Sequence, residues 1–159
     1  MRIKGVNFEC FGDYKEIGML IIFPYCSFKC DKESGCEVCQ NSSLAKEPII
    51  EVSTESLIQT YQSNPLTNAL ICGGLEPFDS PEDLRELLTA FRKASKDAIV
   101  IYTGYTEFEV QKIIDFEWLK SLGNLYIKYG RFKPNQSSHF DELLGVNLAS
   151  ENQYTVYYR

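Results

Sequence analysis

Residues 19–30 read MLIIFPYCSFKC, an apolar run that ends at a proline and is followed at once by two cysteines. The run Met19–Phe23 is typical of a strand that is buried on both faces of a sheet. Since Cys26 and Cys30 follow the end of this strand, we expect their thiols at the carboxyl edge of the sheet, where α/β folds gather their ligands. This stretch therefore predicts both the class of fold and the position of its site.

Strands and helices alternate along the rest of the chain. Three more buried strands are expected, and an amphipathic segment with a helix-capping signal precedes each of them. The expected strands span residues 69–72, 98–102 and 125–129, and the helices begin near Ser53, Ser80 and Thr106. Weaker strand patterns occupy residues 3–11 and 155–158. This α/β alternation predicts βαβ units, a mainly parallel sheet and helices outside it.

The length of 159 residues limits how much of a barrel the chain can form. An eight-stranded (β/α) barrel takes about 250 residues, so we expect a partial (β/α) barrel in one domain, residues 1–159. The net charge of −6, with no basic run, argues against nucleic acid as a ligand. The most apolar stretch, Met19–Pro24, is too short for a bilayer, and no signal peptide is recognised. We therefore expect a cytoplasmic protein with no membrane association.

Four of the six cysteines lie in one polar segment, at positions 26, 30, 36 and 39. Residues 26–43 show neither a helical nor a strand period, which predicts a loop that is ordered around a bound group. A set of thiolate ligands favours zinc or an iron–sulfur cluster. Composition alone leaves both open, so a four-cysteine zinc clip stands beside a cluster as an interpretation.

The remaining cysteines and the single histidine carry less weight. Cys10 and Cys72 lie in strand-like contexts and are expected to be buried as small hydrophobes. His139 lies in a polar, serine-rich segment with no partner in the sequence. We expect it at the surface and not as a ligand.

The cysteine segment resembles the radical-SAM superfamily and, within it, the small activating proteins of anaerobic ribonucleotide reductase. The family signature is Cys, three residues, Cys, two residues, Cys, with a bulky residue before the third cysteine. Cys26-Ser27-Phe28-Lys29-Cys30 matches the first half, and Val38-Cys39-Gln40-Asn41 matches the second half. Between the two halves this sequence carries an insertion.

The resemblance implies that Cys26, Cys30 and Cys39 hold a 4Fe-4S cluster. Three thiolates leave one of the four irons open, and in the family this iron takes the amino and carboxylate groups of S-adenosyl-L-methionine. Cys36 lies inside the insertion and offers a competing ligand. The set Cys30, Cys36 and Cys39 therefore stays open as an alternative.

Later motifs also resemble the family, in the same order along the chain. Gly73-Gly74-Leu75-Glu76-Pro77 resembles its Gly-Gly-Glu-Pro element, and residues 102–105 resemble its Tyr-Thr-Gly-Tyr stretch. Residues 128–132 and 148–153 resemble the Asp-Gly-Arg-Phe and Gly-Ser-x-Asn-Gln elements, with Tyr129 and Ala149 replacing the acid and the glycine. The resemblance implies that S-adenosylmethionine is bound by Val38, Asn41, Gly73, Gly74, Glu76, Thr103, Ser150 and Asn152.

The function implied by the resemblance is reductive cleavage of S-adenosylmethionine to a 5′-deoxyadenosyl radical. A partial barrel is open at its side, which favours a protein substrate, and the implied partner is a glycyl-radical protein such as anaerobic ribonucleotide reductase. A flavodoxin or a ferredoxin-type protein is the implied electron donor. The alternatives are a small-molecule radical-SAM enzyme that resembles the carboxy-deazaguanine synthases, and a non-catalytic four-cysteine zinc-binding module.

Overall fold

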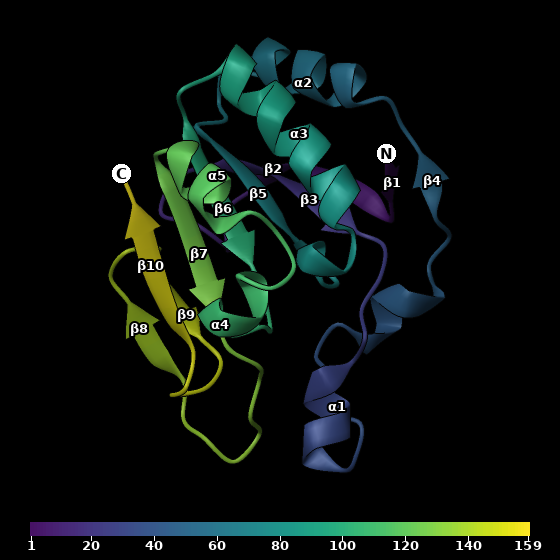
Figure 1. The fold of residues 1–159 in the computed structure, drawn as a ribbon, viewed down its shortest axis with the longest axis vertical. Coiled ribbons are helices and arrows are strands. Elements are labelled where there is room, and N and C mark those ends of the chain that lie inside the picture. The colour runs from purple at the N-terminus through teal and green to yellow at the C-terminus, as the bar shows by residue number, and fades with distance from the viewer.

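A six-stranded sheet forms the centre of the molecule in a computed structural model that describes residues 1–159 (Figure 1). Across the sheet the strands follow the order β10 (Tyr154–Tyr158), β7 (Leu125–Tyr129), β6 (Ala98–Tyr102), β5 (Ala69–Gly74), β3 (Gly18–Phe23) and β2 (Gly5–Cys10). The four inner strands run parallel to one another, and the two edge strands pair antiparallel to their neighbours. Since β2 and β10 do not pair with each other, the sheet is open and forms no closed barrel. The predicted mainly parallel α/β sheet is confirmed.

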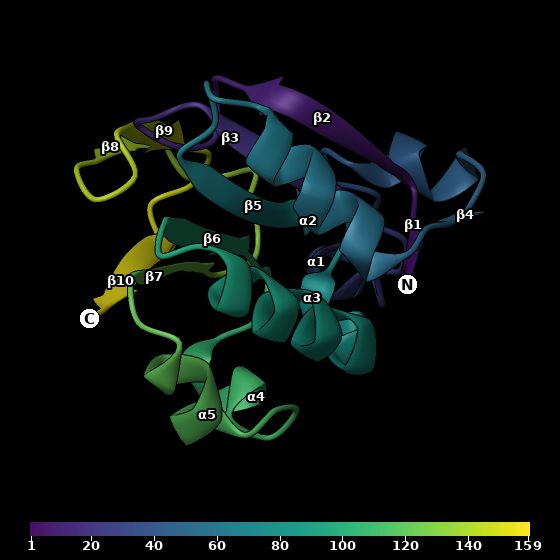
Figure 2. The same cartoon turned by 90° about the horizontal axis from the view of Figure 1, so that it is seen from above.

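Helices cover one face of this sheet (Figure 2). They are α2 (Thr54–Ser63), α3 (Pro81–Ala94), α4 (Glu107–Val110) and α5 (Phe116–Ser121). The apolar sides of α2 and α3, including Leu57, Leu84 and Phe91, pack in one core with Ile21, Ile101 and other residues of the strands. The longest helix, α3, has 14 residues, and no helix combines the length and apolar character that a bilayer span requires.

All three helices begin where the capping signals predicted, and two of the three capping side chains form a hydrogen bond to the helix. Ser53 caps α2 by accepting a hydrogen bond from the Ser56 N–H. Thr106 and Glu109 form a reciprocal capping box at α4. Ser80 precedes α3 as expected, but its hydroxyl caps no backbone group and is buried without a partner.

The opposite, inner face of the sheet has two halves. Near the amino ends of the strands it is filled, because Tyr14, Leu144 and Leu148 pack against side chains such as Ile71 and Val100. Near the carboxyl ends the inward-facing residues line a cavity instead; these residues are Leu20, Ile22, Gly73, Tyr102 and Lys128. The alternation of residues along each strand therefore separates a core on the helix side from a site on the other side.

Two small two-stranded sheets complete the fold. β1 (Arg2–Ile3) pairs with β4 (Ile50–Glu51), and β8 (His139–Asp141) forms a hairpin with β9 (Val146–Leu148). Neither pairing was predicted, since the strands are too short to show a period of two. His139, expected at the surface, lies partly buried in β8, and its Nδ1 atom is enclosed without a hydrogen-bond partner.

The cysteine segment is more regular than the sequence indicated. It contains a helix, α1 (Lys29–Ser34), and a 3-10 helix, η1 (Ser42–Lys46); a shorter one, η2 (Pro77–Asp79), follows β5. Helix α1 begins after Phe28 and ends at Gly35, which both have positive φ angles, 49° and 71°. It buries no residue and lies at the lower end of the molecule in Figure 1, away from the helices that cover the sheet. The absence of an apolar face explains why no helical period marks it.

Candidate metal and cofactor site

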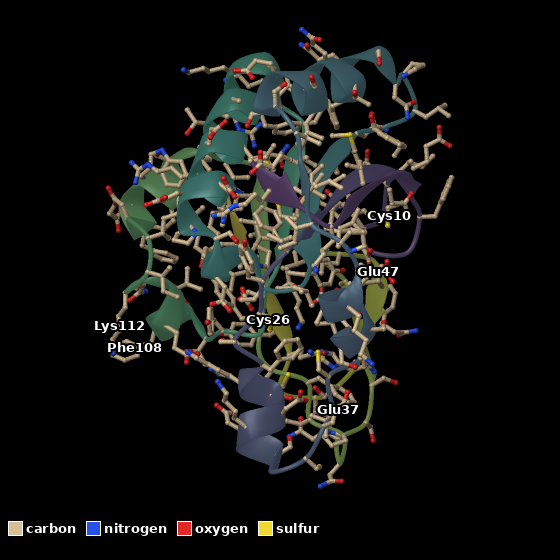
Figure 3. All side chains as sticks on the ribbon, turned by 90° about the vertical axis from the view of Figure 1, so that its right-hand side faces the viewer. Cys10, Cys26, Glu37, Glu47, Phe108 and Lys112 are labelled. Carbon is tan, nitrogen blue, oxygen red and sulfur yellow. The ribbon has the colours of Figure 1, made fainter.

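A cavity of about 440 Å³ lies at the carboxyl ends of the four parallel strands. Its volume is within the range of ordinary ligand pockets, roughly 300–1,000 Å³. Three thiols line it, those of Cys26, Cys30 and Cys39, and so do five of the eight residues predicted to bind S-adenosylmethionine: Asn41, Gly73, Gly74, Glu76 and Thr103. Figure 3 shows Cys26 between the sheet and α1, well separated from Cys10. Cys10 and Cys72 are buried in the sheet, as predicted.

The cysteine segment is tied to the strand ends by hydrogen bonds. The Glu76 N–H donates to the carbonyl of Tyr25 over 2.8 Å, and the Asn41 side-chain amide donates to the carbonyl of Gly74 over 2.7 Å. At its start, the Ser27 N–H donates to the Asp79 carboxylate over 2.6 Å. Both ends of the segment are therefore fixed next to the turn that follows β5.

Asp31 positions the third thiol. Its carboxylate accepts hydrogen bonds from the backbone N–H groups of Val38 and Cys39, each over 2.8 Å. These bonds connect α1, which carries Cys30, with the turn that carries Cys39. Asp31 lies within the insertion, and no pattern in the sequence marked it as a site residue.

Burial raises the pKa of two of the thiols that line the cavity. Desolvation is the largest cause for Cys26, whose pKa rises to about 12, and the nearby carboxylates of Glu76 and Asp79 add to it. For Cys30, desolvation followed by the neighbouring Cys39 raises the pKa to about 11. Cys26 and Cys30 are therefore neutral thiols in the apoprotein, and a metal that takes them as thiolates must displace their protons.

Glu76 and Thr103 face the cavity, but most of their polar atoms already form hydrogen bonds with other groups of the protein. The Glu76 carboxylate accepts hydrogen bonds from the Thr103 hydroxyl (2.7 Å) and from the N–H groups of Gly104 (2.8 Å) and Phe78 (3.2 Å). Its exposed fraction is 6%, and burial raises its pKa to about 7 despite these donors. Glu76 thus joins the ends of β5 and β6 and shapes the wall of the cavity.

Gly74 allows the cavity to form at this turn. Its φ angle is +84°, and a Cβ atom at this position would lie 2.5 Å from Cγ2 of Ile22. Both the backbone conformation and the contact require glycine. A Cβ on Gly73 would meet its neighbours at 3.5 Å or more, which is an ordinary contact.

Val38, Ser150 and Asn152 do not line the cavity. The Ser150 hydroxyl donates to the Asn152 side chain over 2.9 Å, and the Asn152 amide donates to the carbonyl of Arg131, also over 2.9 Å. Gln153 donates to the carbonyl of Gly130 over 3.2 Å. This loop therefore supports the turn after β7, and that turn forms part of the cavity wall.

Cations that were not predicted as site residues lie around the cavity. Arg131 pairs with Glu109 (2.6 Å) and with Glu33 of α1 (3.2 Å), and Lys29 of α1 also pairs with Glu109 (3.2 Å). The hydrogen bond from Arg131 is the largest cause that lowers the pKa of Glu109 to about 2. These ion pairs hold α1 against α4. A third cation, Lys128, lines the cavity from β7.

The donor set fits a cluster better than a single zinc ion. Cys36 is exposed, lies outside the cavity, and its thiol is 3.8 Å from the carbonyl of Ser34. No three His, Cys, Asp or Glu side chains converge as they do around one metal ion. A zinc clip needs four donors around one atom, whereas the thiolates of a 4Fe-4S cluster bind different irons. The three thiols that line the cavity suit the second arrangement.

Comparison with known proteins gives one match. A family model described as a 4Fe-4S single cluster domain matches residues 17–153, a range that contains the cysteine segment and the strands whose ends line the cavity. No curated protein and no solved structure matched the chain significantly.

Proposed function

Because this chain belongs to the 4Fe-4S single cluster domain family, we propose that it is a radical-SAM enzyme in which Cys26, Cys30 and Cys39 hold the cluster. S-adenosylmethionine would bind in the same cavity. Together the two cofactors would supply one-electron reductive cleavage of a C–S bond of the sulfonium, which is chemistry of the cofactors themselves.

One observation carries the proposal: the three thiols and the Gly73-Gly74 turn line a single cavity. These two parts are more than 30 positions apart in the sequence, and the fold brings them together at the carboxyl edge of the sheet. Binding sites of open α/β sheets lie at this edge. Asn41 reinforces the arrangement, since it follows the third thiol and donates a hydrogen bond to Gly74.

The residues of this chain have distinct tasks in the proposed enzyme. The thiols bind the cluster, and Asp31 orients the third of them through the Cys39 N–H. Glu76 shapes the wall on the β5 side. Apolar side chains that line the cavity, including Ile22, Leu44 and Phe132, limit the access of water to it, which protects a reactive radical from side reactions.

We propose a glycyl-radical protein, of the type of anaerobic ribonucleotide reductase, as the substrate. The support is the open sheet, because edge strands that do not meet leave room for a protein loop to reach the cavity. The chemistry that the cofactors would supply is abstraction of a hydrogen atom from a glycine of that loop, which would leave a glycyl radical on the partner and 5′-deoxyadenosine as the other product. A flavodoxin or a ferredoxin-type protein supplies the electron.

The proposal is tested by anaerobic reconstitution with iron and sulfide. The expected product is a brown protein that, with dithionite and S-adenosylmethionine, releases 5′-deoxyadenosine. Cys26→Ser, Cys30→Ser and Cys39→Ser each abolish the product, whereas Cys36→Ser, the matched control, retains it. A colourless protein that holds one zinc ion, or loss of activity in Cys36→Ser with retention in Cys39→Ser, contradicts the assignment.

The choice of substrate needs a second measurement. Reaction with a glycyl-radical subunit is expected to give a carbon-centred glycyl radical in electron paramagnetic resonance spectra. Formation of 5′-deoxyadenosine without any such radical removes the activase function and leaves the cleavage intact. A product formed from a purine-like substrate with no protein partner supports the small-molecule alternative instead.

A further inference from the structure

Lys128 is the only charged residue in the four parallel strands β3, β5, β6 and β7. Its neighbours Ile127 and Tyr129 point to the helix side and belong to the core there, while Lys128 lines the cavity. The exposed fraction of the lysine is 7%. A charged side chain in the middle of a buried sheet is costly unless another group compensates it, so its position calls for a physical reason.

The protein compensates this charge only in part. The Nζ atom donates one hydrogen bond, to the carbonyl of Gly130 over 2.9 Å, although an ammonium group has three donors. Lys128 takes part in none of the four salt bridges of the molecule. The Glu76 carboxylate acts on it electrostatically, but its oxygens already accept three hydrogen bonds from other groups.

The cysteines supply the other partner. Lys128 lines the same cavity as Cys30, one of the three thiols proposed as cluster ligands, and this sulfur is negatively charged once it binds a metal as a thiolate. Burial lowers the pKa of Lys128 to about 8, so the side chain is still mainly an ammonium ion at neutral pH. A cluster ligated by three thiolates carries net negative charge, and it becomes more negative when it accepts an electron. A nearby buried cation therefore stabilises the reduced cluster more than the oxidised one.

Building on the proposed cluster site, we infer that Lys128 tunes the reduction potential of the cluster. Its ammonium group, held on the inner face of β7, favours uptake of one electron from an external low-potential donor. Lys128 takes no part in bond breaking. This role gives a reason for a charge in a strand that is otherwise apolar, since a bound cluster would add the negative charge that Glu76 and the Gly130 carbonyl supply only in part.

The test compares reduction potentials of reconstituted proteins without S-adenosylmethionine. Lys128→Gln keeps a polar side chain that can donate to Gly130, Lys128→Met removes all polarity, and Lys128→Arg keeps the charge. Lys133→Met is the matched control, because it removes an exposed lysine outside the cavity. Redox titration followed by electron paramagnetic resonance gives the midpoint potential, and iron and sulfide analysis gives the cluster content.

The two neutral variants are expected to have more negative midpoint potentials than the wild type, while Lys128→Arg and Lys133→Met keep the wild-type value. Failure of both neutral variants to load a cluster that Lys128→Arg still loads also supports the inference. A cluster-loaded Lys128→Gln protein with the wild-type potential overturns it, as does loss of loading in all three variants. An unchanged potential with weaker S-adenosylmethionine binding assigns Lys128 to the carboxylate of that ligand instead.

Failure of the inference about Lys128 can be distinguished from failure of the proposed function. A wild-type protein that takes up no iron and sulfide contradicts the cluster site itself, and the potentials are then not at issue. A wild-type protein with a cluster and unaltered potentials in the variants contradicts only the role of Lys128.

Discussion

Replacing Asp31 by alanine is expected to loosen the cluster, because this carboxylate holds the turn that carries Cys39. It accepts two hydrogen bonds of 2.8 Å, from the N–H groups of Val38 and Cys39. Hydrogen bonds to a charged group are worth about 1.5–3 kcal/mol each when shielded from water. The side chain is only partly buried, so we take about 1–3 kcal/mol for the pair.

This free energy corresponds to roughly a 5- to 150-fold weaker hold on the cluster. The range matches the effect of removing groups that orient metal ligands in other proteins, about 10–100-fold. Asp31→Asn keeps an acceptor oxygen without the charge, so its effect is expected to be smaller. The expected order of cluster retention is therefore wild type, Asp31→Asn, Asp31→Ala.

In the assay, a chelator removes iron under anaerobic conditions, and the rate is measured from the loss of the visible absorption of the cluster. Lys32→Ala is the matched control, since Lys32 lies next to Asp31 on α1 and is exposed. Wild-type kinetics are expected for this control. If Asp31→Ala loses iron no faster than Lys32→Ala, then the two hydrogen bonds do not position a cluster ligand and the reasoning fails.

Three further predictions concern the apoprotein. Gly74→Ala is expected to lower the free energy of unfolding by about 2–5 kcal/mol in urea titrations, because the positive φ angle and the contact with Ile22 both oppose a Cβ atom. Gly12→Ala is the control, because a Cβ atom there meets nothing, and its free energy of unfolding is expected to change little. Because burial raises the pKa of Glu76 from 4.5 to about 7, the folded state binds its proton more tightly than the unfolded chain does. Stability is therefore lost as the pH rises from about 4.5 to 7, and a flatter pH profile is expected for Glu76→Gln; an identical profile argues against that pKa. Glu109→Gln removes the charge that α1 pairs with, so limited proteolysis should cut residues 29–41 faster, and a rate equal to that of the wild type contradicts this role.

The sequence predicted the parts of the fold that depend on strong apolar periods. The strands around Ile21, Ile71 and Ile101 are continuous apolar runs, and the strand around Ile127 is interrupted only by Lys128. Each strand lies within one residue or two of its expected bounds. A central strand buried on both faces has few alternatives, so its pattern is unambiguous. The order of strands and helices then determined the parallel pairing.

The sequence did not predict elements that lack a buried face. Helix α1 buries no residue, and β8 and β9 have three residues each, so neither periodicity nor length distinguishes them from a loop. Their conformations depend on tertiary contacts, such as the ion pair between Arg131 and Glu33. Such contacts are formed between residues far apart in the chain and leave no local pattern.

The candidate site also contains some residues that the sequence predicted and others that it did not. Cysteines and glycines at strand ends can be recognised because few other residues serve there, and the motifs placed Cys26, Cys39 and Gly74 correctly in one cavity. Asp31 could not be recognised, since a carboxylate on a surface helix is an ordinary feature. Lys128 stands out as a charge in an apolar strand, but the sequence does not show that it lines the same cavity as the thiols. Only the directions of their side chains show what they face.

The filled half of the inner face has a consequence for the range of ligands that the fold can accept. Beside the strand residues, Asp13 and the β9 residues Asn147 and Leu148 line the cavity, and the packed side chains of Tyr14 and Leu144 lie next to them. Gly145 of the hairpin presses on Lys15, so a Cβ there would lie 2.8 Å from that of the lysine. A change in the length of the β8–β9 turn or of the loop at Lys15 would therefore alter the depth of the cavity, while the thiols and the helix-side core stay in place. The depth of the cavity and the proposed cluster ligands thus depend on separate segments, so one can change in evolution without the other.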